Sequence, residues 1–352
     1  MTTVPASLGD VVGRVECRVR TLLEPERARW SAVDPSLAEP FEAVLGLVLA
    51  GGKRLRPAFI HWGFVGAGGE PGDARSIDAG AAIELLHAFA LLHDDVMDGS
   101  ATRRGAPATH VVLAQRHGGR GWRGEARRFG EGLAVLFGDL AFVQADRLLV
   151  DAPTEARAIW NELRVELTVG QFLDLVGTAT GERGCAAAER IARYKSAKYT
   201  VERPLHLGAL LVDAPRRADM LGHYSRYGLP LGDAFQLRDD VLGAFGDADR
   251  TGKPVGDDLR EGKPTALLAV ATERASATEA AVLAGVGRPE LDDDDVAAIL
   301  QVLVDTGALV EVEDRIDRLT GEALDALEDA PIPDEARKGL TELAHVVAWR
   351  ER

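Results

Sequence analysis

The sequence predicts an all-α protein of about ten to thirteen helices. Apolar residues recur every three or four positions along almost the whole chain, whereas strict alternation of apolar and polar residues is nearly absent. Alanine and leucine dominate these stretches, and both residues favour helix. Because no stretch reads as a convincing strand, we expect helices to build the core and to position every functional side chain.

The helical stretches follow one another with short breaks. The most distinctive covers residues 81–98, AAIELLHAFALLHDDVMD, whose first part is almost wholly apolar. The others cover 131–149, 155–176, 186–200, 219–246, 264–286, 295–305, 307–327 and 334–349. The acidic run LDDDD at 291–295 is expected to open a helix, because acidic side chains suit a helix N-terminus.

Glycine and proline mark the loops. These are GGKRLRP at 51–57, a second loop at 66–73, an arginine-rich one at 116–130 and a fourth at 248–264. None is long and polar enough to separate independent domains, so we expect residues 1–352 to form one domain. The loop at 116–130 carries five arginines. A solvated loop, a subunit contact and a lid are all open interpretations of it.

Composition narrows the class of protein. Acidic residues outnumber basic ones by 56 to 41, giving a net charge of −15, which argues against a general nucleic-acid binder but not against a local basic pocket. Two cysteines, Cys17 and Cys185, provide neither a disulfide framework nor a zinc site. We find no apolar run of about 18 residues and no secretory signal at the N-terminus, so we expect a cytoplasmic protein without a membrane span.

Three aspartates end the helix predicted at 81–98. Asp94 and Asp98 are four positions apart and share a face about 6 Å apart along the axis, with Asp95 beside them. Carboxylates buried without partners are costly, so this helix end needs a cation. Oxygen-only ligands favour magnesium or calcium over zinc. The alternative is a solvated helix terminus.

A second acidic cluster, Asp239 and Asp240, ends another apolar stretch. Gln236 lies one turn before Asp240, and Asp247 follows further along. If the two helices face each other, their carboxylates would clamp hard cations, which usually serve phosphates.

Basic residues complement the two acidic clusters. Each alone is most simply a surface charge, but together they suggest one anion held through metal ions and another held directly by Arg and Lys. They are Lys53, Arg54, Arg56, Arg103, Arg104, Lys195, Lys198, Lys253 and Lys263. His87 lies seven positions before Asp94 on nearly the same face. It is either a core histidine or a hydrogen-bond donor to the second anion.

At this point the sequence resembles the trans-isoprenyl diphosphate synthases, or polyprenyl synthetases. The motifs that carry the resemblance are GGKRLRP, LLHDDVMDGSATRRG, GQFLDL, YKSA, FQLRDD and GDADRTGKPVGDDLREGKP, spread over about residues 40–270. The resemblance implies the isoprenoid synthase fold, with helices around a deep central cavity, in a homodimer. The implied reaction joins isopentenyl diphosphate to an allylic diphosphate (dimethylallyl, geranyl or farnesyl) with Mg²⁺, three ions in the family.

The resemblance also assigns roles to individual residues. The implied metal ligands are Asp94, Asp98 and Asp239, supported by Asp95 and Asp240. Matches to allylic-diphosphate contacts are Arg103, Lys195, Ser196, Gln236, Lys253 and Lys263. Matches to the isopentenyl diphosphate site are Lys53, Arg56, His87 and Arg104, while Gln171 and Asp174 match a polar patch near the metals.

Product length is expected to depend on the floor below the first acidic cluster. Phe89 and Ala90 lie five and four positions before Asp94, roughly 6–8 Å along the axis. One aromatic residue at the deeper position with a small neighbour resembles some geranylgeranyl diphosphate synthases, whereas two aromatic residues would resemble farnesyl diphosphate synthase. We therefore expect geranylgeranyl diphosphate as the product. Ordinary core packing is the alternative interpretation of Phe89.

One position departs from the family pattern. Gly243 stands where many members have a third aspartate, which puts metal affinity or the geometry of the third site in doubt. Two rival functions remain: a class I terpene cyclase, disfavoured by the isopentenyl-site residues, and a non-catalytic regulatory subunit, whose only support is Gly243.

Overall fold

The computed structural model describes residues 9–103, 105–213, 217–246, 255–288 and 290–349. The chain groups into two compact units, one formed by residues 1–157 and 204–218 and the other by 158–203 and 219–352. The single domain expected for 1–352 stays a prediction. Among the helices described, none combines the length and apolar character needed to cross a bilayer.

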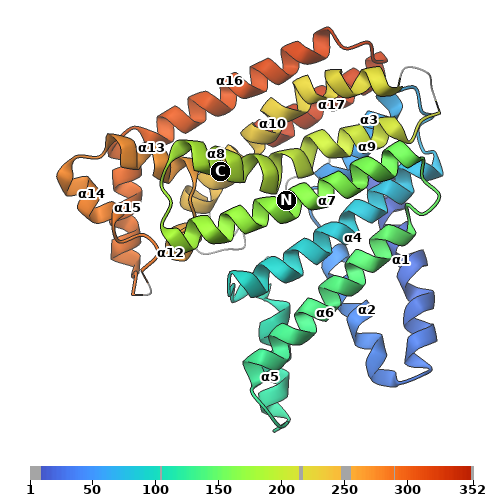
Figure 1. The fold of residues 1–352 in the computed structure, drawn as a ribbon, viewed down its shortest axis with the longest axis horizontal. Coiled ribbons are helices and arrows are strands. Elements are labelled where there is room, and N and C mark those ends of the chain that lie inside the picture. The colour runs from blue at the N-terminus through green and yellow to red at the C-terminus, as the bar shows by residue number, and fades with distance from the viewer. Residues whose placement is uncertain (1–8, 104, 214–216, 247–254, 289, 350–352) are drawn as a thin grey trace. The chain divides into compact units, whose positions relative to one another are not determined.

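In the part of the chain that the structure describes, the first unit is helical apart from one small hairpin, and Figure 1 labels its longer helices. Its helices are α1 (Gly9–Ser31), η2 (Pro35–Ala38), α2 (Glu39–Leu49), α3 (Leu55–Gly66), α4 (Ala74–Met97), α5 (Thr109–Gly119), α6 (Ala126–Arg147) and α9 (Arg203–Leu210). The hairpin pairs β1 (Thr102–Arg103) with β2 (Ala106–Pro107) in antiparallel register, with Gly105 at φ 74° in the turn. The prediction that the chain has no strand was therefore wrong for this hairpin, whose two strands have two residues each.

Helix α4 is the central element of the first unit, since α1, α2, α3, α5 and α6 all contact it. Its residues from Ala79 to Leu86 are all buried, because the small side chains from Ala79 to Ala82 let the neighbouring helices approach closely. Burial of more than two full turns on all sides fixes the direction of the helix and therefore the place of the aspartates at its end.

The second unit contains the remaining helices. They are α7 (Thr154–Thr180, which begins in the first unit), α8 (Cys185–Ala192), the π-helix η3 (Arg193–Glu202), α10 (Arg217–Phe245), α12 (Asp257–Glu261), α13 (Ala266–Arg274), α14 (Ala277–Leu283), α15 (Asp293–Asp305), α16 (Ala308–Glu328) and α17 (Asp334–Ala348). One apolar core joins α10, α13, α15 and α16. Asp292 caps α15 with a capping box, which confirms that LDDDD opens a helix.

Several predicted boundaries were wrong for local reasons. The stretch 264–286 divides into α13 and α14, because Ser276 and Glu279 form a capping box that starts a new helix. The stretch 186–200 becomes π-helical from Arg193. Helices α5 and α6 extend into the expected loop 116–130, and α12 lies within the expected loop 248–264. Helical segments therefore outnumber the ten to thirteen expected.

Candidate active site

The first acidic cluster lies at the C-terminal end of α4. Asp98 caps the helix, and its backbone N–H donates to the carbonyl of Asp94 (2.8 Å). Asp95 is buried, whereas Asp94 and Asp98 are half-buried. The C-terminal end of a helix carries partial negative charge, so carboxylates here oppose the helix dipole as well as one another. The fold therefore holds this cluster in a place that only a cation stabilises.

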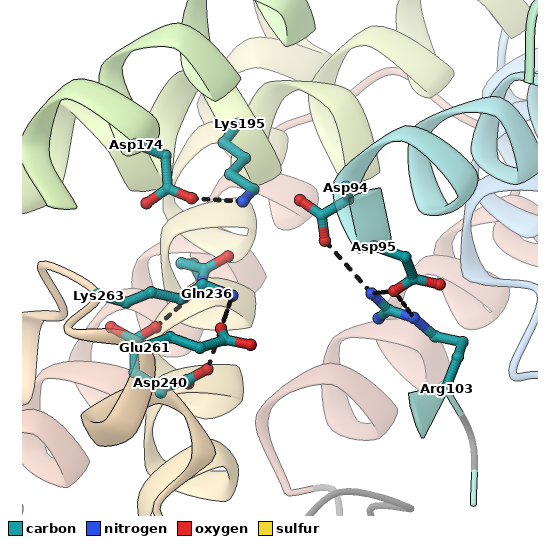
Figure 2. A network of polar contacts seen from close by, with 10 residues as sticks. Asp94, Asp95, Arg103, Asp174, Lys195, Gln236, Asp240, Glu261 and Lys263 are labelled. Carbon is teal, nitrogen blue, oxygen red and sulfur yellow. Dashed lines mark hydrogen bonds and ion pairs between the residues drawn. The ribbon is translucent and has the colours of Figure 1, made fainter. Parts of the chain in front are cut away.

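Arg103 supplies one such cation from β1. Its Nε donates to Oδ1 of Asp95 (2.8 Å), and its guanidinium also reaches Oδ2 of Asp94 (3.4 Å; Figure 2). Burial raises the pKa of Asp95, while the bonds from Arg103 act in the opposite direction. Burial alone would lower the pKa of Arg103, but its bonds to the aspartates outweigh burial and raise it. Arg103 is thus held protonated beside Asp95.

Two aromatic rings contact each other near Phe89, which lies five positions before Asp94 on α4. Phe89 contacts Phe142 of α6 with 4.9 Å between ring centroids, and it contacts the His93 ring at 4.5 Å. Phe89 and Ala90 are both half-buried. Phe142 was missed by the sequence reasoning, because only its helical spacing within 131–149 marks it.

A glycine explains how α6 comes so close to the end of α4. A Cβ atom on Gly138 would lie 2.3 Å from Cδ2 of His93, which no side chain tolerates. In this close packing, Nε2 of His93 donates to the carbonyl of Val135 (3.0 Å). His93 therefore joins the two helices, and the Phe89–Phe142 contact follows from that packing.

The three cations of GGKRLRP do not share one environment. Arg54 is buried and donates to Glu84 and to Glu16 (2.9 Å), so it is a structural residue and not part of a basic surface. It also has a left-handed backbone (φ 50°), which the bonds of its side chain stabilise. Lys53 and Arg56 on either side of it are half-buried, as is His87 on α4.

In the second unit, Lys195 lies on the π-helix η3 and donates to Oδ2 of Asp174 on α7 (2.5 Å; Figure 2). Two glycines hold η3 between its neighbours. A Cβ on Gly170 of α7 would lie 2.2 Å from the backbone nitrogen of Lys195, and one on Gly232 of α10 would lie 2.6 Å from the carbonyl oxygen of Ala197. Backbone-to-backbone packing thus fixes the position of Lys195 relative to α7 and α10.

Lys198, the second basic residue of this segment, has a buried partner. Lys198 and Arg203 both donate to Glu166 of α7, with 2.6 Å from Arg203 Nη2 to Oε1. Burial acts to raise the pKa of Glu166, but the bonds from the two cations prevail and lower it. Glu166 was not identified from the sequence, because a lone acid on a helix carries no distinguishing pattern.

The second acidic cluster ends α10 and divides into two environments. Asp240 is buried; it accepts from Nε2 of Gln236 (2.7 Å; Figure 2) and from the backbone N–H of Ala266 (3.1 Å), which opens α13. Burial, with repulsion from Asp258 and Asp239, raises the pKa of Asp240 to about 7. Asp239 is half-buried. Asp240 therefore fastens α10 to α13, while Asp239 keeps more contact with solvent.

Acidic groups of α12 lie near the end of α10. Nζ of Lys263 is 2.5 Å from Oε2 of Glu261 and 4.0 Å from Oδ1 of Asp258. A Cβ on Gly243 would lie 2.2 Å from the other oxygen of Asp258. The carboxyl group of Asp258 thus occupies the space beside Gly243.

Other predicted site residues are distributed as follows. Gln171 and Ser196 are half-buried in α7 and η3. Arg104, Lys253 and Asp247 lie outside the described residues. Within the described part, no three His, Cys, Asp or Glu groups converge on a point that would hold a metal ion. Whether the clusters on α4 and α10 face each other stays a prediction.

Known proteins show what class of molecule combines this fold with acidic helix ends. Residues 36–303 match the family model described as polyprenyl synthetase, so the chain belongs to the polyprenyl synthetase family. Its activity is that of an isoprenyl diphosphate synthase, a trans-prenyltransferase. The expected all-α isoprenoid synthase fold is confirmed.

Individual relatives are similar over most of their length. The geranylfarnesyl diphosphate synthase of Aeropyrum pernix is 33% identical, with 86% of this chain and 91% of the relative covered. The geranylgeranyl diphosphate synthase of Mycobacterium tuberculosis is 34% identical over 80% and 78% of the two chains. A Corynebacterium glutamicum geranylgeranyl pyrophosphate synthase, crystallised with isoprenyl diphosphate and magnesium, superposes with a TM-score of 0.91 at 38% identity, covering 98% of this chain and 99% of the other.

Proposed function

We propose that this enzyme condenses isopentenyl diphosphate with an allylic diphosphate in the presence of Mg²⁺ and releases geranylgeranyl diphosphate. The observation that carries the choice of product is the Phe89–Phe142 contact below Asp94. A ring pair there closes the path of a growing chain that starts at the carboxylates. The family membership supports the reaction type, and the relatives' different products leave the chain length to experiment.

The donor chemistry of the acidic residues fits magnesium. Asp94, Asp98 and Asp239 offer only oxygen atoms and are all half-buried, so they remain accessible to an ion. Mg²⁺ usually binds through one or two carboxylates and completes its shell with water and substrate phosphates. Few protein ligands therefore suffice. We propose that Asp94, Asp98 and Asp239 hold Mg²⁺, with three ions in all.

Bound Mg²⁺ supplies Lewis-acid neutralisation of the leaving diphosphate. The chain's own cations act on the same group: Arg103, Lys195 and Lys263 donate hydrogen bonds to phosphate oxygens as the C–O bond breaks. The acids beside them, Asp95, Asp174 and Glu261, keep each cation in place before substrate arrives. Ser196, Gln236 and Lys253 are the further contacts we propose for the allylic diphosphate.

Isopentenyl diphosphate is proposed to bind to Lys53, Arg56, His87 and Arg104. Its double bond attacks the allylic carbon, and the proton that is then lost passes to the departing diphosphate. Apolar walls around the allylic cation exclude water, which would otherwise capture it.

We also propose that the enzyme is a homodimer. On α7 of the second unit, Val165, Val169, Phe172 and Val176 fall at i, i+4, i+7 and i+11 and all are exposed, with Phe172 at 64%. A soluble chain rarely exposes such a stripe unless another surface covers it. Sedimentation of the wild type and of Phe172→Glu tests this, since a charge at the stripe is expected to yield monomers.

Incubating the purified protein with Mg²⁺, isopentenyl diphosphate and each allylic primer tests the proposed reaction. Geranylgeranyl diphosphate is the expected product. If the product is farnesyl diphosphate, the chain-length limit lies closer to Asp94 than the Phe89–Phe142 contact. Hydrocarbon formed from geranylgeranyl diphosphate alone would indicate a cyclase. A protein that binds Mg²⁺ but turns over no primer would be a regulatory subunit. The cytoplasmic location stays a prediction.

A further inference from the structure

The turn between α5 and α6 gathers an unusual amount of positive charge. We refer to residues 116–128 as the α5–α6 tip, which Figure 1 shows at the end of that helix pair. The tip contains Arg116, Arg120, Arg123, Arg127 and Arg128. Glu125 is its one acidic residue, although the whole chain has a net charge of −15. A local excess of this kind in an acidic protein calls for an anionic partner.

Only two of these arginines have acidic partners within the part of the chain described. Arg116 pairs with Glu39, and Nε of Arg127 donates to Glu131 (2.6 Å). The other three, Arg120, Arg123 and Arg128, are exposed and pair with no described acid. Their charges are thus available to a partner outside the chain.

A hydrogen bond and aromatic contacts link the residues of the tip to one another. Nε2 of His117 donates to the carbonyl of Arg123 (3.0 Å), and the His117 ring packs on Phe129 at 4.9 Å. Trp122 covers Phe129 at 5.4 Å while remaining 41% exposed. The guanidinium of Arg120 lies 5.2 Å from the Trp122 ring centroid. Tryptophan and arginine are therefore presented side by side on an ordered turn.

We propose that the α5–α6 tip binds the surface of an anionic phospholipid bilayer. Arginine pairs with lipid phosphates through its planar fork, and tryptophan favours the boundary between headgroups and acyl chains. The acidic remainder of the protein does not prevent contact, because charges beyond a Debye length of about 8 Å are largely screened. The choice of a lipid surface over another polyanion rests on the proposed function, since a product with a long apolar chain leaves the enzyme for a bilayer.

Co-sedimentation of the full-length protein with vesicles, without substrate, tests the proposal. Binding is expected to phosphatidylcholine vesicles that contain phosphatidylglycerol, but not to phosphatidylcholine alone, and it is expected to weaken as salt rises. Replacing three arginines together, Arg120→Gln, Arg123→Gln and Arg128→Gln, is expected to lower the partition coefficient on the order of 100-fold. Trp122→Ala is expected to lower it further.

A matched control removes the same charge elsewhere. Arg157→Gln, Arg190→Gln and Arg288→Gln change three exposed arginines outside the tip and are expected to leave vesicle binding intact. Equal loss in both triple variants would overturn the proposal, as would binding of single-stranded RNA in preference to vesicles, or a change in oligomeric state with the tip variant alone. Turnover of soluble substrates in detergent, measured separately, reports on the proposed reaction and is expected to be unchanged in both variants.

Discussion

Gly243 of α10 lies directly against Asp258 of α12, so close that a Cβ atom at position 243 would lie 2.2 Å from Oδ2 of Asp258. The position at which many family members have a third aspartate is therefore not an empty space in this chain. A carboxyl group from another helix fills it. The same carboxyl group is near enough to Asp240 to contribute to the raised pKa of that residue.

Restoring an aspartate at 243 is expected to harm the protein unless Asp258 is removed. Gly243→Asp should lower the free energy of unfolding by about 1–3 kcal/mol, because the new side chain overpacks a filled space. The double variant Gly243→Asp, Asp258→Gly should recover most of that loss in thermal unfolding. The Mg²⁺ concentration needed for half-maximal turnover should be closer to the wild-type value in this double variant than in Asp258→Gly alone. If the stability losses of the two single variants simply add in the double variant, the two carboxyl groups are not interchangeable.

Asp94→Ala is expected to reduce turnover by several orders of magnitude, because the proposed Mg²⁺ loses a ligand and neutralises the leaving diphosphate less well. Steady-state kinetics at several Mg²⁺ concentrations measures this. Asp151→Ala, at an exposed turn of the same unit, is the control and should retain activity. Near-normal turnover of Asp94→Ala would contradict its role.

Phe89→Ala is expected to lengthen the product, and Phe142→Ala should do the same, because each variant removes one ring of the pair that forms the proposed floor. Chromatography of the dephosphorylated products measures chain length. Phe41→Ala removes a buried ring from α2 and should cost stability without changing the product. If only Phe89→Ala changes chain length, the floor is formed by α4 alone.

Gly170→Ala is expected to lower both stability and turnover, because a Cβ there meets the backbone of Lys195 and would push η3 away from α7. The expected loss in the free energy of unfolding is about 1–3 kcal/mol. Gly222→Ala is the matched control, since nothing lies within 4 Å of a Cβ on that helical glycine. It should gain roughly 0.5–1 kcal/mol. Urea unfolding with activity assays distinguishes the two.

His61 makes stability depend on pH. Burial, with the nearby charge of Arg14, lowers its pKa to about 4. In the unfolded chain His61 takes up a proton below pH 6.5, whereas in the folded chain it does so only at about pH 4. The free energy of unfolding is therefore unaffected by this group above pH 6.5 and falls as the pH drops from 6.5 to 4. We expect a loss of about 2 kcal/mol at pH 5. His61→Leu should flatten this part of the profile in urea titrations, and an unchanged slope would assign it to other groups.

Local patterns in the sequence were enough to predict the helix of the first acidic cluster. An apolar repeat followed by Asp94, Asp95 and Asp98 specifies both the buried face and the charged end of α4. The capping box of Ser276 and Glu279 was also readable from the sequence, and overlooking it merged α13 with α14.

Contacts between distant segments could not be predicted in this way. Arg54 looks like its neighbours Lys53 and Arg56, and only its burial beside Glu84, thirty positions away, distinguishes it. The π-helix likewise depends on glycines of two other helices that permit close approach. Such features require knowledge of which backbones meet, which one sequence does not contain.

The π-helical register of η3 has a consequence for how this segment tolerates change. Each wide turn accommodates one residue more than an α-turn would. A single deletion between Lys198 and Glu202 would therefore convert a wide turn into an α-turn and narrow the helix where it packs against Gly170 and Gly232. The backbone of Lys195 would then lose its close contact with Gly170, and its bond to Asp174 would be displaced, although every motif residue was still present. Length here is as strictly constrained as residue type.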